Sequence, residues 1–296
     1  MQSAPRNGSR SVVITGASRN MGLEAAIYLA ERGFRVYATM RNLADSYRVK
    51  NAAKQKNLDI HVHQLDVTDD RSIKRAIDDI VSDCGKIYGL VNIAGIYLRG
   101  YFEDTSEKEI RQVFDTNVFG TMAVTRAVLP HMRSVRNGCI VTVTSVAGRS
   151  GAVTVSGYCA SRHAQEGFCE SLAQEVTPFG IKVVIIEPAI LKTDRWGTDH
   201  RSATGALNPD SIYYEWYKKA AMLMDKAALS SPTVAGDIVK IIYKALTKRR
   251  PKLRYLVGPR ARFFFFLRRY LPDELFLRVY FNLVNRCVLG PKNGRA

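Results

Sequence analysis

A glycine-containing turn between a β-branched run and an apolar-periodic stretch constrains the fold of this chain more than any other feature. Residues 11–15 (Ser-Val-Val-Ile-Thr) predict a strand, residues 22–32 a helix that ends at Gly33, and residues 35–39 a second strand. Strand, turn, helix and strand within about 30 residues make a βαβ unit. Parallel strands joined in this way need helices on both faces of the sheet.

The alternation continues along the chain. Further strands are predicted at 61–65, 88–92, 139–144 and 182–187, and further helices at 70–83, 106–132 and 155–177. We therefore predict an α/β fold: a single doubly wound Rossmann-type domain over residues 11–249, with a mostly parallel sheet of six or seven strands. A polar N-terminal tail (1–10) would precede it, and a basic, aromatic, helical C-terminal extension (250–296) would follow.

Composition narrows the class of protein. The 296 residues are 46% apolar, the five cysteines form no CxxC pair, and no apolar run approaches the ~20 residues that span a bilayer. The first ten residues carry no apolar leader segment. These features predict a cytoplasmic protein without a structural metal. Nearly half of the net charge of +17 lies in residues 252–296, which hold ten Lys and Arg residues and two acidic ones.

The turn itself has the features of a phosphate-binding loop. Glycines let the backbone approach a pyrophosphate, and the following helix N-terminus supplies amides and positive potential. The alternative is a plain tight turn. The residues expected to contact a dinucleotide are Gly16, Ser18, Arg19, Asn20, Met21 and Gly22.

The end of the second strand indicates which dinucleotide binds. A carboxylate there would hold a ribose 2′-hydroxyl, but residues 38–41 read Ala-Thr-Met-Arg. Arg19 and Arg41 suit a 2′-phosphate dianion, so the sequence favours NADP(H). The alternative is a pair of solvated surface arginines.

A second constellation lies further along the chain. Ser145 follows the predicted strand 139–144, Tyr158 comes thirteen residues later, and Arg162 is one helical turn beyond Tyr158. Hydroxyl groups aimed at one oxygen stabilise the oxyanion that forms when a carbonyl accepts hydride. A neighbouring cation lowers the pKa of a phenol, so Arg162 would activate Tyr158 for proton transfer. Asn117 lies in the preceding predicted helix.

The turn and this spacing resemble two motifs of the short-chain dehydrogenase/reductase family, Thr-Gly-x-x-x-Gly-x-Gly and the Asn-Ser-Tyr-Lys tetrad, over residues 11–193. The resemblance implies catalytic roles for Asn117, Ser145, Tyr158 and Arg162, with Asn117 holding a water of a proton relay. It also implies cofactor contacts from Tyr158 and Arg162 through the nicotinamide ribose, and from Asp66, Val67, Asn92, Ala94, Gly95, Pro188 and Thr193.

The sequence departs from the family pattern at four positions: Asn20 and Ala189 replace glycines, Ile93 replaces an asparagine, and Arg162 replaces the catalytic lysine. Asn is the residue best suited to replace Gly in a left-handed conformation. Arg keeps the charge but does not release a proton. We expect slower or altered redox turnover. The alternatives are non-redox lyase or isomerase chemistry, or a catalytically weak, membrane-associated cofactor-binding protein.

The remaining segments concern substrate and partners. Loops 96–102, 146–157 and 194–225 are substrate candidates, and the aromatics of the last one predict either a lid over a lipophilic substrate or a helix packed into the core. The wider pattern resembles 17β-hydroxysteroid and retinol dehydrogenase-like members, which implies a hydrophobic ketone, aldehyde or alcohol.

The basic, aromatic residues 260–290 favour either peripheral membrane contact or packing on the domain or a second subunit. Nucleic acid is not expected, because no binding motif accompanies the charge. By resemblance to the family, helices 106–132 and 155–177 would pair subunits in a homodimer.

Overall fold

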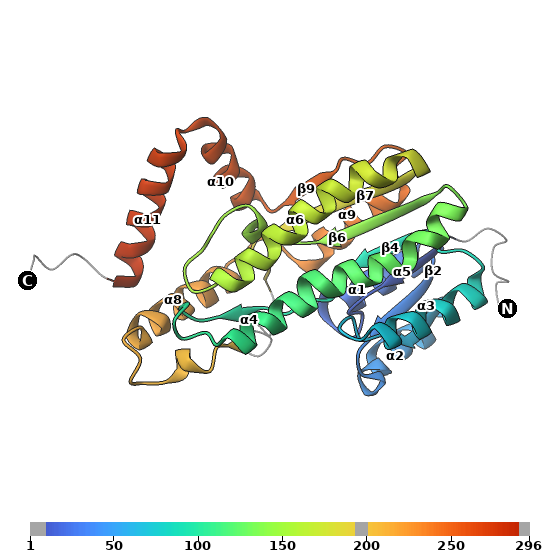
Figure 1. Cartoon of the computed structure of the whole chain (residues 1–296), viewed down its shortest axis with the longest axis horizontal. Helices are drawn as coiled ribbons and strands as arrows, with labels where there is room; N and C mark the ends of the chain where they lie inside the picture. Colours follow the sequence, from blue (N-terminus) through green and yellow to red (C-terminus); the bar gives the residue numbers. More distant parts are fainter. Residues whose placement is uncertain (1–9, 193–200, 290–296) are drawn as a thin grey trace, which may run out of the picture.

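A seven-stranded parallel sheet organises the computed structural model, which describes residues 10–192 and 201–289. Within these residues the strand order is β3-β2-β1-β4-β6-β7-β9, and every neighbouring pair is parallel (Figure 1). The strands are β1 (Ser11–Ile14), β2 (Arg35–Met40), β3 (Ile60–Gln64), β4 (Gly89–Asn92), β6 (Gly138–Val143), β7 (Ile181–Pro188) and β9 (Arg254–Val257). The predicted doubly wound fold is confirmed.

The last strand of the sheet comes from an unexpected part of the chain. β9 pairs with β7 along Ile185 to Pro188, beyond residue 249, where we expected the Rossmann-type domain to end. The expected boundary is therefore wrong by at least the length of this strand. Its short apolar run, Tyr-Leu-Val, lies among basic residues, so the pattern resembles the basic extension more than a strand.

Helices cover both faces of the sheet, as strand periodicity requires. In β1, Val12 and Ile14 face one core cluster while Val13 faces the other. The first face is covered by α1 (Asn20–Ala30), α2 (Tyr47–Lys56) and α9 (Ala235–Thr247). The second is covered by α3 (Asp70–Cys84), α5 (Gly120–Ser134) and α6 (Ser156–Val176).

The segment predicted as one helix over 106–132 is interrupted. It consists of α4 (Glu107–Phe114), a π-helical turn (Asp115–Phe119) and α5. Ser106 and Glu109 form a capping box that starts α4. In the π turn the Gly120 amide bonds the Asp115 carbonyl, five residues back, so the usual hydrogen-bond register is broken beside Asn117.

Smaller elements lie outside the sheet. β5 (Leu98–Arg99) and β8 (Arg201–Ser202) pair in parallel, and α8 (Tyr214–Leu229) follows them. The chain ends in α10 (Pro259–Tyr270) and α11 (Asp273–Leu289), which stand out from the sheet as an arm whose second helix contacts α8 (Figure 1). Among the described residues, no helix is both long enough and apolar enough to cross a membrane.

Candidate active site

The turn after β1 has the backbone geometry of a phosphate-binding loop. Gly16 and Asn20 have φ angles of 71° and 48°, so Asn20 adopts the left-handed conformation expected of a glycine replacement. A Cβ on Gly16 would lie 2.9 Å from the Cα of Ala94, and a Cβ on Gly22 would overlap the Gly16 carbonyl oxygen. Only glycine fits at either position, and the N-terminus of α1 faces the loop.

Thr15 joins this turn to the loop that follows β4. Its Oγ1 accepts hydrogen bonds from the amides of Ile93 and Ala94, both at 3.1 Å. Its own amide donates to the Val91 carbonyl. The predicted cofactor residues of the two loops therefore meet at the carboxyl ends of neighbouring strands, where ligands bind in open sheets.

Most of the other predicted cofactor residues line the same edge of the sheet. Arg19 and Arg41 are exposed, after β1 and β2 respectively. The Asp66 carboxylate accepts from the amide and hydroxyl of Thr68. Further positions are Ser18, half-buried; Met21, packed on the core; Val67, packed against Gly120; and Pro188, the last residue of β7. Thr193 lies outside the described residues.

Two buried amide side chains, one of which supports the loop after β4, lie near the carboxyl end of this strand. Asn117 accepts from the Ile96 amide at 2.8 Å and donates to the Ile96 carbonyl at 3.0 Å and to Ser161 Oγ at 3.1 Å. Asn92 donates to Thr125 Oγ1, while its buried Oδ1 has no partner in the described part of the chain. Asn117 thus fixes the loop through protein contacts, and Asn92 keeps an acceptor for a further donor.

Tyr158 lies in the first turn of α6, half-buried, with aromatic and cationic neighbours. The ring of Tyr97 meets it edge-on with centroids 4.8 Å apart. The Arg162 guanidinium carbon lies 5.0 Å from the Tyr158 ring centroid, so the predicted cation is beside the phenol. Ser145 caps a short 3-10 turn, Val146–Gly148, that packs against α6, and its Oγ accepts from the Ala147 amide.

Arg162 is a buried cation held by neutral acceptors. It is 7% exposed, and Nη1 donates to the Val143 carbonyl at 3.2 Å and to Gln165 Oε1 at 2.7 Å. Among residues 10–192 and 201–289, its Nε has no hydrogen-bond partner and no carboxylate forms an ion pair with it. A buried cation without a counter-charge needs every available acceptor, and within the described residues only the Nη1 donors have acceptors.

Gln165 connects Arg162 to the π turn, and sequence reasoning missed it. Its Nε2 donates to the Asn117 carbonyl at 2.5 Å and to Thr121 Oγ1 at 2.9 Å. The Asn117 carbonyl also accepts a hydrogen bond from the Thr121 hydroxyl. It accepts these two side-chain bonds at the place where the π turn interrupts the regular backbone hydrogen bonds of the helix. One sequence signal existed: Gln165 lies one turn beyond Arg162 on the same helix.

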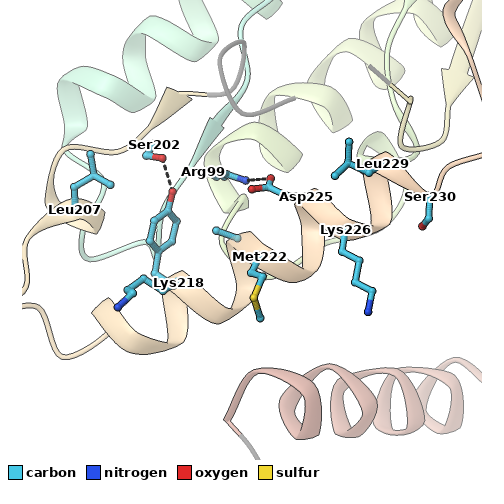
Figure 2. A pocket seen from close by; sticks show the side chains of 11 residues that line it. Arg99, Ser202, Leu207, Lys218, Met222, Asp225, Lys226, Leu229 and Ser230 are labelled. Atoms are coloured by element: carbon cyan, nitrogen blue, oxygen red, sulfur yellow. Dashed lines mark hydrogen bonds and ion pairs between the residues drawn. The ribbon is translucent and has the colours of Figure 1, made fainter. Parts of the chain in front are cut away.

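Two of the three loops predicted for substrate, 96–102 and 194–225, contribute to a separate pocket of about 840 Å³ beside α8, and the loop 146–157 does not line it (Figure 2). Arg99 Nη1 pairs with Asp225 at 2.7 Å, and the Tyr217 hydroxyl bonds Ser202 Oγ at 2.5 Å. On α8, seven residues beyond Tyr217, Met224 Sδ lies 3.9 Å from the Tyr97 hydroxyl. The ring that contacts Tyr158 therefore also touches the helix that lines this pocket.

The described aromatics of the 194–225 segment pack together with Tyr101, and Trp216 keeps 38% of its surface exposed. Tyr213 stacks on Tyr101 with centroids 4.5 Å apart, Trp216 packs beside both rings, and Tyr217 is buried. Part of the 194–225 segment, including Trp196, lies outside the described residues.

Comparison with known proteins places this site in a family. The model for short chain dehydrogenases matches residues 10–203. The chain belongs to the short-chain dehydrogenase family. An uncharacterized oxidoreductase of Bacillus subtilis, YusZ, is 39% identical over 83% of this chain and 88% of its own length. Retinol dehydrogenase 8 of Bos taurus is 36% identical over 83% of this chain and 80% of its own.

Solved structures agree on the fold. ElxO, solved with NADP bound, has a TM-score of 0.69 and 25% identity, covering 85% of this chain and 96% of its own. A Burkholderia phymatum short chain dehydrogenase/reductase solved with NAD has a TM-score of 0.76 and 22% identity, covering 91% and 95%. The family is one of nicotinamide-dependent oxidoreductases. Its members include one solved with NADP and one solved with NAD.

Proposed function

We propose that this chain is an NADP(H)-dependent oxidoreductase that transfers hydride between the nicotinamide and a lipophilic ketone, aldehyde or alcohol. The observation that carries the proposal is the position of Tyr158, with the Arg162 guanidinium 5.0 Å from its ring centroid at the sheet edge that holds the glycine turn. The relative named retinol dehydrogenase 8 supports a lipophilic substrate.

The site residues fit a dinucleotide. The turn leaves no room for a side chain at Gly16 or Gly22, the Asn92 Oδ1 and Arg162 Nε are buried without partners among the described residues, and Arg19 and Arg41 are exposed where a 2′-phosphate would need cations. The strand β2 ends without a carboxylate to repel that phosphate. ElxO, solved with NADP, supports the same preference.

When bound, the nicotinamide supplies or accepts the hydride. In the reducing direction, Tyr158 donates its phenolic proton to the substrate oxygen and Ser145 donates a hydrogen bond to the same oxygen, so a carbonyl becomes an alcohol. Arg162 favours the phenolate that Tyr158 leaves, because a positive charge stabilises a nearby anion. Solvent then returns the proton to Tyr158, since Arg162 does not release one.

The experiment is NADPH oxidation, followed at 340 nm, over a panel of ketones and aldehydes, with Tyr158→Phe as the variant. We expect turnover of lipophilic carbonyls and a loss of kcat on the order of 10²-fold or more in Tyr158→Phe. Isothermal titration with NADPH checks that the variant still binds cofactor. Tyr47→Phe, an exposed tyrosine outside the proposed site, is the matched control.

Two outcomes would overturn the proposal. Turnover that survives Tyr158→Phe would show that Tyr158 is not the proton donor. Conversion of substrate without any change in NADPH would favour non-redox chemistry on the same scaffold instead.

A further inference from the structure

The C-terminal helices expose an unusual set of large apolar side chains. On α10, Phe263, Phe266 and Tyr270 are 65%, 58% and 67% exposed. Their spacing of three and four residues puts them on one face of the helix. Ala261 and Phe265, which are buried against the domain, lie on the opposite face. The outward apolar face is therefore not the face that α10 uses for packing.

α11 also exposes large apolar side chains. Leu275, Val279 and Leu283 are each about half exposed and are spaced by four residues, so they form one stripe. Phe276 is buried against Phe264 of α10, and Val288 is buried near the end of α11. We call the two sets, Phe263–Phe266–Tyr270 and Leu275–Val279–Leu283, the apolar stripes.

Arginines border both stripes. Arg262 and Arg269 lie along one side of the α10 stripe and Arg260 along the other, while Arg278 and Arg286 are exposed on α11. Over residues 259–289 six arginines face two carboxylates, Asp273 and Glu274. Helices with an apolar face flanked by basic residues bind at the surface of anionic membranes.

We propose that α10 and α11 dock this protein on an anionic lipid surface through the two apolar stripes. Charge decides between this occupant and a second copy of the chain, because a two-fold contact would bring the arginine borders of both copies together with only Asp273 and Glu274 of each copy to match them. An anionic bilayer offers phosphate groups to the arginines and acyl chains to the aromatics. Neither helix need cross the bilayer for this contact.

α10 also lies close to the candidate substrate region, through the face opposite its apolar stripe. Arg268 of α10 donates to the Arg149 carbonyl at 2.6 Å, and the Arg149 guanidinium lies 4.6 Å from the Phe265 ring centroid. Arg149 follows Ser145 in the loop after β6. A membrane-bound α10 would therefore hold this loop near the lipid phase, where a lipophilic substrate is concentrated.

The experiment is co-sedimentation of the full chain with vesicles, which needs no turnover and is therefore independent of the proposed function. Vesicles of phosphatidylcholine are compared with vesicles containing 30% phosphatidylserine, about the proportion that a cytoplasmic leaflet would present. We expect binding to the anionic vesicles that weakens as the salt concentration rises from 0.1 to 0.5 M, roughly the range over which screening becomes strong.

Two double variants test the stripe and its border separately. Phe263→Ser with Phe266→Ser removes half-exposed aromatic surface and should weaken binding about tenfold or more. Arg262→Gln with Arg269→Gln should weaken it about 25-fold, since each arginine near an anionic surface contributes about fivefold. The controls are Val135→Ser with Ile212→Ser, exposed apolar residues elsewhere, and Arg249→Gln with Arg250→Gln.

The outcomes separate cleanly. Loss of binding in both stripe and border variants, but in neither control, supports the proposal. It is overturned if the wild type stays in the supernatant with anionic vesicles, or if the controls lose as much binding as the stripe variants. It is also overturned if sedimentation velocity shows that Phe263→Ser with Phe266→Ser dissociates a dimer, because a second copy then covers the stripe. A dimer formed through α5 and α6 would not respond to these variants.

Discussion

Replacing Gln165 with leucine should disturb the proposed catalytic cation without touching any residue that contacts substrate. Leucine is close to glutamine in size and suits the interior of α6. It removes the acceptor that lies 2.7 Å from Arg162 Nη1, and the donor that serves the Asn117 carbonyl and Thr121. Gln165 is 1% exposed, so water cannot easily replace either partner.

The expected loss of stability follows from the polar groups that Gln165→Leu leaves buried. The guanidinium remains charged and keeps only the Val143 carbonyl as an acceptor among the described residues. Hydrogen bonds to charged groups contribute about 1.5–3 kcal/mol, and the neutral bonds to Asn117 and Thr121 about 1 kcal/mol more. We therefore expect Gln165→Leu to lower the free energy of unfolding by about 2.5–4 kcal/mol.

Urea denaturation followed by circular dichroism measures this difference. Gln174→Leu is the control on the same helix, because Gln174 is exposed and its only described hydrogen bond, to the Glu170 carbonyl, is 3.4 Å long. We expect the control to stay within about 0.5 kcal/mol of wild type. A Gln165→Leu protein as stable as the control would refute the network.

A double-mutant cycle separates the Arg162 contact from general packing. If Gln165 acts through the guanidinium, Gln165→Leu should cost much less in an Arg162→Met background, with a coupling of about 1.5–3 kcal/mol. Under the proposed function, Gln165→Leu should also lower kcat more than it raises the KM for NADPH, because a displaced guanidinium no longer favours the Tyr158 phenolate. An equal effect on both constants would indicate a structural role alone.

Three further predictions test two cofactor positions and one buried carboxylate. Gly22→Ala should weaken NADPH binding about fivefold or more in a fluorescence titration, because its Cβ overlaps the Gly16 carbonyl and overpacking of this kind costs about 1–3 kcal/mol. Arg41→Ala should raise the Kd for NADPH by about tenfold or more but leave that for NADH unchanged, and equal losses would contradict a 2′-phosphate contact. Burial raises the pKa of Glu166 above its ordinary 4.5, so its stabilising contribution is complete below pH 4.5 and is lost as pH rises through the raised value. Urea titrations between about pH 4.5 and 8 should therefore show the stability of wild type falling relative to Glu166→Gln, and a relative gain would contradict this.

Most of the fold could be predicted from local patterns in the sequence. The β-branched runs, the glycine turn and the position of Asn20 each depend on neighbours within a few residues, so the sequence predicts them directly. The helix α2 escaped prediction because Val49 is its only buried residue, which leaves almost no apolar periodicity. β9 escaped because its partner, β7, is about 70 residues away and its own run is short.

The same distinction between local and distant partners applies to the residues of the site. Tyr158 and Arg162 could be paired from sequence, because four residues on one helix bring them together. Gln165 could not be assigned a role, because its partner carbonyl lies in a π turn 48 residues earlier. Helical pitch alone predicts an ordinary helix over that turn, with every interior carbonyl already bonded. The role of a side chain that serves the backbone of another element depends on a defect that periodicity does not reveal.

The same contacts change how the arginine at position 162 should be understood. From sequence it is a departure that interrupts a proton relay. In the structure its surroundings match a guanidinium: Nη1 has two neutral acceptors, and Gly95 leaves space beside Nη2, where a Cβ would lie 3.0 Å away. A carboxylate in place of Gln165 would neutralise the cation and weaken its effect on Tyr158. Neutral acceptors hold the guanidinium in place while its charge remains available to the phenol, so the arginine is supported as a fixed charge rather than as a proton carrier.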